Sequence, residues 1–221
     1  MQTWINALSW LNFGFLLKGL AVTLFISVFA IVLSFIFGSV LGIIRYAKIK
    51  FISAIVGFLI DIVRNLPLLL IIFFTYFGLP NIGLRPGAIL SAIIAMTIFE
   101  SSMIAEIVRS GIQSVAVGQI EGARSTGMTF VQALWHVVLP QAYRHMIPTI
   151  IGQFVSLVKD TSLATIIVVP ELMQHAQVIY GQNANYIVPM FAALTLLYFI
   201  VCFSLSVIGN RLNKRLAQSK V

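Results

Sequence analysis

A carboxylate at position 100 lies within a long apolar stretch of the sequence, together with two hydroxyl side chains. Thr97, Glu100 and Ser101 are spaced i, i+3 and i+4, so on a helix they share one face. An ionisable group inside an apolar segment is by default a candidate functional residue. Glu100 could hold the ammonium group of an amino acid, or it could pair with a basic side chain of another segment, for which Arg64 and Lys159 are the candidates.

Arg64 offers the complementary chemistry, because a guanidinium group is well suited to clamp a carboxylate. It follows Asp61 by three residues, so a local ion pair on one helix face is the alternative interpretation. Pro67 removes the hydrogen bond that the carbonyl of Val63 would otherwise receive. The loosened turn therefore offers a carbonyl, the amide of Asn65 and the guanidinium close together.

A third polar group follows one face of a later apolar helix. Thr149, Gln153, Ser156 and Asp160 fall at offsets 0, 4, 7 and 11, which is helical periodicity. A polar stripe on an apolar helix must face protein or water, and it indicates the lining of a path for a polar solute. Hydrogen bonding between helices is the alternative, favoured for Thr149 and Ser156 and equally balanced for Asp160. Lys159 lies about 100° around the helix from Asp160, so the two are expected to have different partners.

These groups define the candidate site. The residues predicted to line a solute path are Arg64, Asn65, Glu100, Gln153, Ser156, Lys159, Asp160 and Ser162. Glu106 and Arg109, again three residues apart, are interpreted as a structural or gating pair. No metal site is predicted, because His136 and His145 have no cysteine or carboxylate at metal-ligand spacing.

The composition places these polar groups in a membrane. The 221 residues are 60% hydrophobic and only 9% charged, with a mean hydropathy of +1.03 and a formal net charge of +8. Soluble domains carry roughly 25% charged residues. The chain is therefore predicted to be an all-α integral membrane protein whose basic loops face an anionic membrane surface rather than nucleic acid.

Five membrane spans within one domain, residues 19–210, are predicted from the length of each apolar stretch. The predicted spans cover residues 19–44, 51–79, 88–110, 147–169 and 186–210. Residues 1–18 are predicted to form an interfacial helix, residues 172–185 an external helix, residues 111–146 a polar loop and residues 211–221 a basic tail. Small residues along one face of the first span, ending in Gly38 and Gly42, predict close helix packing.

The distribution of lysine and arginine predicts the orientation. Ten of these residues lie on the side of the polar loop and the basic tail, and only Lys18 and Arg85 lie on the other. The positive-inside rule then places the N-terminus outside and the C-terminus in the cytoplasm, as an odd number of spans requires.

The polar loop has the signals of two short helices. Gly127 is suited to end a helix that begins at Gly118, and Thr129 with Gln132 fits a capping box that starts the next. Pro140 is expected to end or kink that second helix. An ordinary amphipathic loop would give a similar pattern.

The residues of this loop resemble the EAA–G–I-x-LP signature of ABC importer permeases. The matching residues are Glu121-Gly122-Ala123, Gly127 and Val137-Val138-Leu139-Pro140. Gly122 replaces the usual alanine and Val137 the usual isoleucine. Segments 64–67, 105–113 and 159–163 resemble the polar amino-acid branch of the family, and segment 99–106 most closely its glutamate, aspartate and glutamine permeases.

The resemblance implies a five-helix, MetI-like type I permease in the bacterial cell membrane, which imports a polar amino acid. It implies that the loop helix docks on a separate ATPase subunit, present in two copies. The residues it assigns to this coupling are Glu121, Gly122, Ala123, Arg124 and Gly127. It also implies a second permease, identical or similar, and an extracytoplasmic solute-binding protein.

The sequence contains no phosphate-binding G-x-x-x-x-G-K-[ST] loop, so ATP and Mg²⁺ are expected in the partner ATPase and no cofactor in this chain. No G-x-S-x-G or H-E-x-x-H motif occurs, and the chain is not expected to be an enzyme. A permease for another small polar solute and an ATP-independent carrier are the alternatives. Which amino acid is carried, and whether this chain contacts it directly, stay open.

Overall fold

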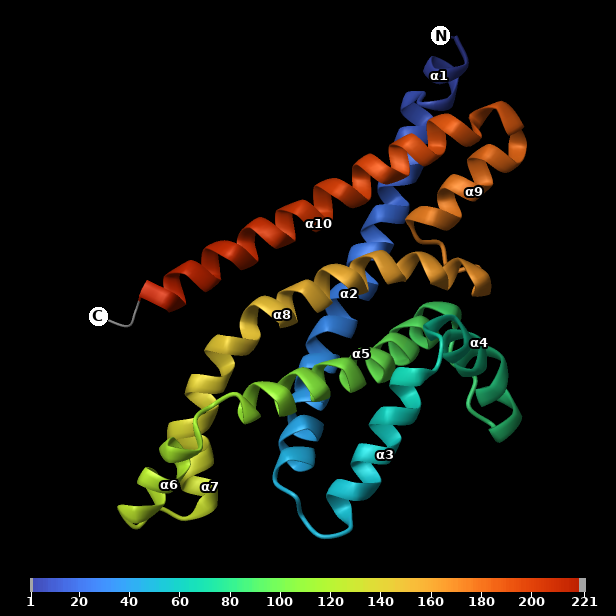
Figure 1. The fold of residues 1–221 in the computed structure, drawn as a ribbon. Coiled ribbons are helices and arrows are strands. Elements are labelled where there is room, and N and C mark those ends of the chain that lie inside the picture. Colours follow the sequence, from blue (N-terminus) through green and yellow to red (C-terminus); the bar gives the residue numbers. More distant parts are fainter. Residues whose placement is uncertain (1, 219–221) are drawn as a thin grey trace.

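The computed structural model describes the backbone of residues 2–218 and, at the C-terminal end, side chains as far as Asn213 (Figure 1). Lys214, Arg215 and Lys220 of the predicted basic tail lie outside the described side chains. The described residues form helices and their connections, as predicted. The helices in chain order are α1 (Gln2–Ala7), α2 (Trp10–Tyr46), α3 (Ile52–Asn65), α4 (Leu68–Gly78), η1 (Leu79–Ile82), α5 (Ala88–Gln113), α6 (Val117–Ser125), α7 (Phe130–Ala133), η2 (Leu134–Val138), α8 (Leu139–Asp160), η3 (Thr161–Ile167), α9 (Leu172–Gln182), η4 (Ala184–Tyr186) and α10 (Ile187–Gln218).

Four of the described helical segments are long and apolar enough to cross a membrane, and a bent pair brings the number to as many as five. The single segments are Trp10–Tyr46, Ala88–Gln113, Phe130–Ile167 and Ala184–Asn213. The bent pair is Ile52–Asn65 with Leu68–Ile82, at an angle of 102°.

The predicted second span, residues 51–79, is therefore not one straight helix. Leu66 is extended, with a ψ of 141°, and the chain enters α4 through Pro67. The residue before a proline is driven out of the helical region, which explains why α3 ends at Asn65. The break turns α4 away from α3, beside α5 (Figure 1).

The first long helix begins earlier than predicted. The hydroxyl of Ser9 accepts a hydrogen bond from the backbone N–H of Asn12, and this N-cap starts α2 at Trp10 rather than near residue 19. With 37 residues, α2 is about 55 Å long, well beyond the roughly 30 Å of a hydrocarbon core. Residues 10–18 thus belong to α2, and only α1 is a separate N-terminal helix.

The fourth apolar segment also begins earlier than the predicted residue 147. Pro140 does not end the helix, because the five residues before Leu139 widen into a π-helical turn, η2, that continues directly into α8. The N–H of Leu139 bonds to the carbonyl of Leu134, five residues back. A π turn changes the pattern of backbone pairing next to the proline, which has no N–H to donate.

Glycines bring α2 and α5 into close contact. A Cβ added at Gly38 would lie 2.7 Å from Cβ of Ile104, and one added at Gly42 would lie 2.5 Å from the carbonyl oxygen of Ala105. The close packing predicted for this face of α2 is confirmed.

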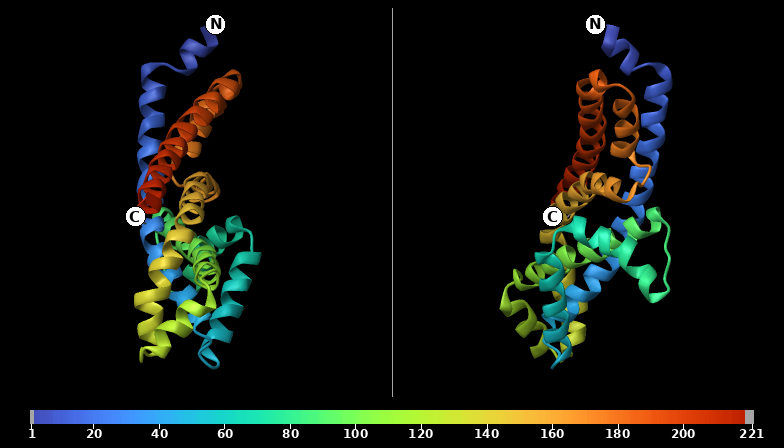
Figure 2. Two further views of the ribbon diagram at one scale, coloured as in Figure 1. Left: turned by 60° about the vertical axis from the view of Figure 1, so that its left-hand side comes forward. Right: turned by 90° about the vertical axis from the view of Figure 1, so that its right-hand side faces the viewer.

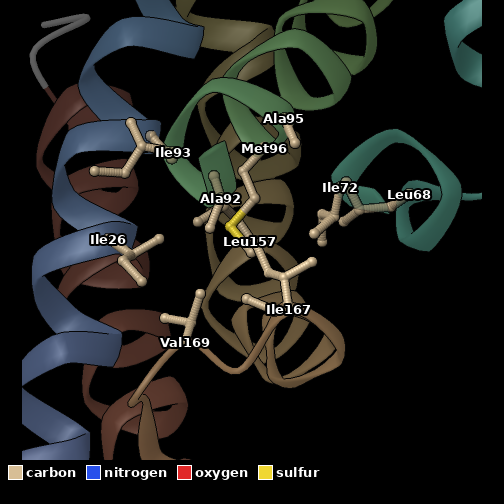
Figure 3. Packing of buried hydrophobic residues seen from close by; sticks show 12 residues of the cluster. Ile26, Leu68, Ile72, Ala92, Ile93, Ala95, Met96, Leu157, Ile167 and Val169 are labelled. Carbon is tan, nitrogen blue, oxygen red and sulfur yellow. The ribbon is translucent and has the colours of Figure 1, made fainter. Parts of the chain in front are cut away.

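The buried core joins helices that are distant in sequence. Figure 3 shows Ile26 of α2, Met96 of α5 and Leu157 of α8 meeting Ile72 of α4 and Ile167 of η3. These contacts fix the relative positions of the helices that carry the polar residues.

The polar loop and the outer helix lie at opposite ends of the molecule. In all views, α6 and α7 lie at the same end as the turn between α2 and α3, whereas α1 and α9 lie at the other end (Figures 1 and 2). The end that carries α6 and α7 is called the loop end below.

Candidate functional site

Glu100 is fully buried between α5 and α8. Nε2 of Gln153 donates a hydrogen bond of 3.0 Å to Oε2 of Glu100. The other carboxylate oxygen, Oε1, has no partner in the described part of the chain, and neither have the hydroxyls of Thr97 and Ser101. The predicted polar face of α5 is therefore present, and three of its oxygens keep free hydrogen-bonding capacity.

An ion pair of Glu100 with Arg64 or Lys159, one of the two alternatives for this residue, is not formed. Within the described residues, Glu100 makes no salt bridge, and its polar contact is the neutral amide of Gln153. Arg64 instead lies near Glu106, almost two helical turns further along α5. Lys159 is exposed on α8 and forms no ion pair with a described residue.

A network of charged side chains ties α2, α3 and α5 together. Arg45 is its centre, with Nη2 at 2.9 Å from Oδ2 of Asp61 and Nη1 at 3.1 Å from Oε2 of Glu106. Arg109 donates from Nε to Oε2 of Glu106 at 2.9 Å, and its Nη2 contacts Oε1 of the same carboxylate. The predicted contact between Glu106 and Arg109 is thus present, within a larger network.

Arg64 is the loosely held member of this network. Its Nη1 lies 3.9 Å from both Asp61 and Glu106, beyond hydrogen-bond distance, and Asp61 is bound by Arg45 instead. The amide of Asn65 donates to the carbonyl of Asp61 at 2.7 Å. The Arg64 guanidinium therefore keeps donors free for another ligand.

Arg64 also lines a polar cavity of about 670 Å³ between α3, α5 and α8. Glu106 borders it on α5, and Thr149 and Gln153 border it on α8. His145 contributes to the wall near the loop end, with Nδ1 at 3.2 Å from the Ser114 hydroxyl. The cavity thus brings together charged and amide side chains that lie almost ninety residues apart in the sequence.

Six predicted path residues lie outside the lining of this cavity: Asn65, Glu100, Ser156, Lys159, Asp160 and Ser162. Ser156 and Asp160 are half-buried further along α8, and the Ser162 hydroxyl bonds to the carbonyl of Lys159 at 2.8 Å. Thr149, for which interhelical bonding was the favoured explanation, does line the cavity.

Sequence reasoning missed Arg45, which it used only to predict orientation. Counting charges gave no signal for it, because Arg64 and Arg109 already balance the carboxylates Asp61 and Glu106. The position of Arg45 at the end of α2 gave no indication of which carboxylate it would reach.

The polar loop has the predicted two-helix form. Gly127 adopts a φ of +92°, a left-handed conformation that favours glycine, and its N–H bonds to the carbonyl of Arg124 at 3.1 Å. The capping box of Thr129 and Gln132 is complete in both directions. Glu121, Gly122 and Arg124 are exposed on α6, Ala123 is half-buried, and a Cβ at Gly122 would meet no other atom. Alanine, usual at position 122 in the signature, would therefore fit.

A second polar cluster fastens α9 near the opposite end. Glu171, fully buried, caps α9 by accepting from the N–H groups of Met173 and Gln174 at 2.8 Å, and Tyr198 donates to it at 3.2 Å. Burial raises the pKa of Glu171 to about 7, against these hydrogen bonds, which lower it. His175, one turn later, donates from Nδ1 to the Phe15 carbonyl at 2.7 Å, and its ring stacks on the Phe15 ring.

The chain is similar to known proteins over nearly its whole length. A family model described as "binding-protein-dependent transport system inner membrane component" matches residues 34–218. A probable glutamine ABC transporter permease protein, GlnP of Bacillus subtilis, is 49% identical over 96% of this chain and 98% of its own length. The glutamate/aspartate import permease protein GltK of Escherichia coli is 31% identical over 92% of this chain and 94% of its own.

Solved structures share the fold. A chain from an amino acid ABC transporter with histidines superposes with a TM-score of 0.84, at 28% identity, over 91% of this chain and 94% of that one. A chain of the inward-facing MetNI methionine ABC transporter superposes with a TM-score of 0.82, at 21% identity, over 94% of this chain and 99% of that one.

Proposed function

Because the chain belongs to the family of binding-protein-dependent transport system inner membrane components, we propose that it forms the solute path of an ATP-driven importer for a polar amino acid. It is a permease subunit of the bacterial cell membrane, and the family is a membrane component rather than a catalytic one. Glutamine, glutamate and aspartate are the proposed substrates, because relatives named for them match over nearly the whole chain.

The polar cavity of α3, α5 and α8 is the observation that carries this proposal. The negative charge of Glu106 on its wall is neutralised, because Glu106 is bound by Arg45 and Arg109. Arg64 is the cation with free donors, so it can bind the carboxylate that every amino acid carries. Gln153 lines the same cavity and bonds to Glu100, whose Oε1 is buried behind this lining and has no hydrogen-bond partner among the described residues. A zwitterion matches this distribution of charge.

The exposed α6 helix is the proposed docking element for a separate ATPase subunit, with one copy for each of two permease chains. Glu121 and Arg124 present charge on its surface, and the left-handed Gly127 fixes the turn that follows. This docking would make the loop end cytoplasmic, with the N-terminus outside and the C-terminus inside. Lys48 and Lys50 lie in the turn at the same end, as the positive-inside rule requires.

The remaining partners follow from the family and complete the importer. A second permease, identical or similar, would close the solute path. An extracytoplasmic binding protein would deliver the amino acid to the end that carries α9, and ATP with Mg²⁺ would be consumed in the ATPase subunits.

The test is uptake of labelled glutamine, glutamate and aspartate by proteoliposomes that contain the permease, its ATPase and its binding protein. Arg64→Gln keeps the length and polarity of the side chain but removes its charge. Since a hydrogen bond to a charged group contributes about 1.5–3 kcal/mol, uptake is expected to fall about 10- to 100-fold. ATP hydrolysis stimulated by the binding protein should persist, because α6 is unchanged.

Arg85→Gln is the matched control, because Arg85 is exposed in the loop before α5 and does not line the cavity. Its uptake is expected to equal that of the unmodified chain. Undiminished uptake by Arg64→Gln would refute the role of the cavity, and uptake of none of the three amino acids would refute the substrate class.

A further inference from the structure

The turn between α2 and α3 has an unusual backbone. Lys48 has a φ of 51° and Phe51 a φ of 65°, so two of its five residues are non-glycine residues in the left-handed region. Each costs roughly 1–2 kcal/mol relative to the right-handed region. The conformation is held from outside, since the Ser53 hydroxyl bonds to the carbonyl of Ile44 at 2.6 Å and Arg45 joins Asp61. The turn is therefore a fixed feature that presents its side chains in one arrangement.

The positive charges of two lysines in this turn are not balanced by a carboxylate of the described residues. These lysines border a groove of about 640 Å³ that also touches Arg45, Arg109 and one carboxylate, Asp61. Arg45 and Arg109 are engaged by Asp61 and Glu106. Within the described residues, which include all six acidic residues, Lys48 and Lys50 form no salt bridge. The groove thus offers two free positive charges.

Apolar side chains continue from this groove along α3. Phe58 lines the groove itself, and it belongs to a stripe at i, i+3, i+4 and i+7 that is exposed along its length. The stripe consists of Ile55, Phe58, Leu59 and Ile62, between 41% and 67% exposed. The helix α3, which carries the stripe, runs from the turn at the loop end to the bend before α4 (Figure 1). The surface is therefore cationic at one end and apolar over about 10 Å beyond it, at 1.5 Å per residue.

We propose that this surface binds one anionic phospholipid, with its phosphate on Lys48 and Lys50 and an acyl chain along the α3 stripe. The two charges match an anionic headgroup and the stripe matches hydrocarbon. Phe51, 73% exposed, lies between the two regions, and the Lys50 ammonium sits 5.5 Å from its ring centroid. A soluble partner at the loop end would cover the lysines but not the stripe, which leads away from that end.

The test is native mass spectrometry of the complete importer complex, titrated with phosphatidylglycerol or with phosphatidylcholine. In Lys48→Asn/Lys50→Gln both charges are removed, and asparagine tolerates the left-handed conformation at position 48. A lysine near an anionic surface contributes a factor of about five in affinity, so the double variant is expected to bind phosphatidylglycerol about 25-fold more weakly. Phosphatidylcholine binding should not change.

The matched control is Lys18→Gln/Arg85→Gln, which removes two exposed cations elsewhere, and Lys48→Arg/Lys50→Arg should retain binding because it keeps the charge. Unchanged phosphatidylglycerol affinity in the first variant, or an equal loss in the control, would overturn the proposal. So would displacement of the lipid by glycerol phosphate, which lacks an acyl chain. Loss of the ATPase subunit with the lipid retained would assign the turn to that protein instead. None of these results depends on the transported substrate.

Discussion

Glu171 is a buried carboxyl group whose protonation is linked to the packing of α9. Its oxygens cap α9 and accept from Tyr198 on α10, while Thr23 of α2 accepts from the N–H of Leu172. Glu171 thus connects α9 with α10, and the neighbouring Leu172 connects α9 with α2, at the end opposite the polar loop. The compensating hydrogen bonds favour the ionised form, but burial outweighs them and the pKa is raised to about 7.

This pKa makes the stability of the permease depend on pH. Between the ordinary value of 4.5 and about 7, the folded chain holds a proton that the unfolded chain has released. The stability contributed by the protonated form is therefore complete below about pH 4.5 and is lost as the pH rises through 7. The melting temperature of the unmodified permease is expected to fall over this range.

Glu171→Gln should reduce that fall, because glutamine is neutral throughout and the difference corresponds to on the order of 2 kcal/mol. The melting temperatures of the purified chain and of the variant, measured near pH 4.5 and near pH 7, give this difference. Glu121→Gln, at an exposed site on α6, is the control and should leave the pH dependence as it is. A pH dependence equally steep in Glu171→Gln would show that another group is responsible.

At the scale of helices, the contact of α2 with α5 depends on the absence of side chains. Gly42 brings the backbone of α2 against the carbonyl of Ala105, and Gly38 does the same near Ser101 and Ile104. This contact positions Arg45, one turn beyond Gly42, so that it reaches both Asp61 and Glu106. The charged network therefore rests on the glycine packing.

Gly42→Ala is expected to destabilise the permease by about 1–3 kcal/mol, because a rigid backbone atom lies 2.5 Å from the added carbon and the helices must separate. Gly14→Ala is the control on the same helix. Its added carbon meets no atom within 4 Å, so it should be neutral or stabilising by up to about 1 kcal/mol. Thermal unfolding of both variants decides the matter, and equal melting temperatures would contradict the prediction.

At the scale of the whole molecule, the polar cavity and the exposed α6 helix are separate parts of one chain. The cavity lies among α3, α5 and α8, whereas α6 lies at the loop end (Figure 2). The helix α7, which follows α6 after the turn at Gly127, continues through the π-helical turn η2 into α8, and α8 forms one wall of the cavity. If α6 docks on an ATPase as proposed, its motion would be passed through the turn at Gly127 to the helix that carries Thr149 and Gln153.

Glu121→Ala combined with Gly127→Val is expected to abolish ATP-driven uptake. Valine at a φ of +92° is strained, which would distort the turn after α6, and the alanine removes an exposed charge. Uptake in proteoliposomes and co-purification of the ATPase measure the effect. Gly118→Ala is the control in the same helix, where an added carbon meets no atom within 4 Å. Unchanged uptake by the double variant would contradict the proposed role of α6 in coupling.

The sequence alone determined the helical class, the apolar segments, the turn at Gly127 and the capping box at Thr129. Each depends on local chemistry: on the length of an apolar run, on a left-handed glycine, or on a side chain that reaches a backbone group three residues away. For the same reason it predicted the pairs that lie within one helix, such as Glu106 with Arg109.

Only the tertiary structure decided which polar groups meet across helices. The partner of Glu100 is Gln153 rather than Arg64 or Lys159, and Arg45 rather than Arg64 neutralises Asp61. These outcomes depend on how deep and at what rotation each helix packs, and the bend at Pro67 alone turns the following helix by about a right angle. Periodicity fixes the face of a helix, but contacts between helices also depend on their translation and crossing angle, which packing sets.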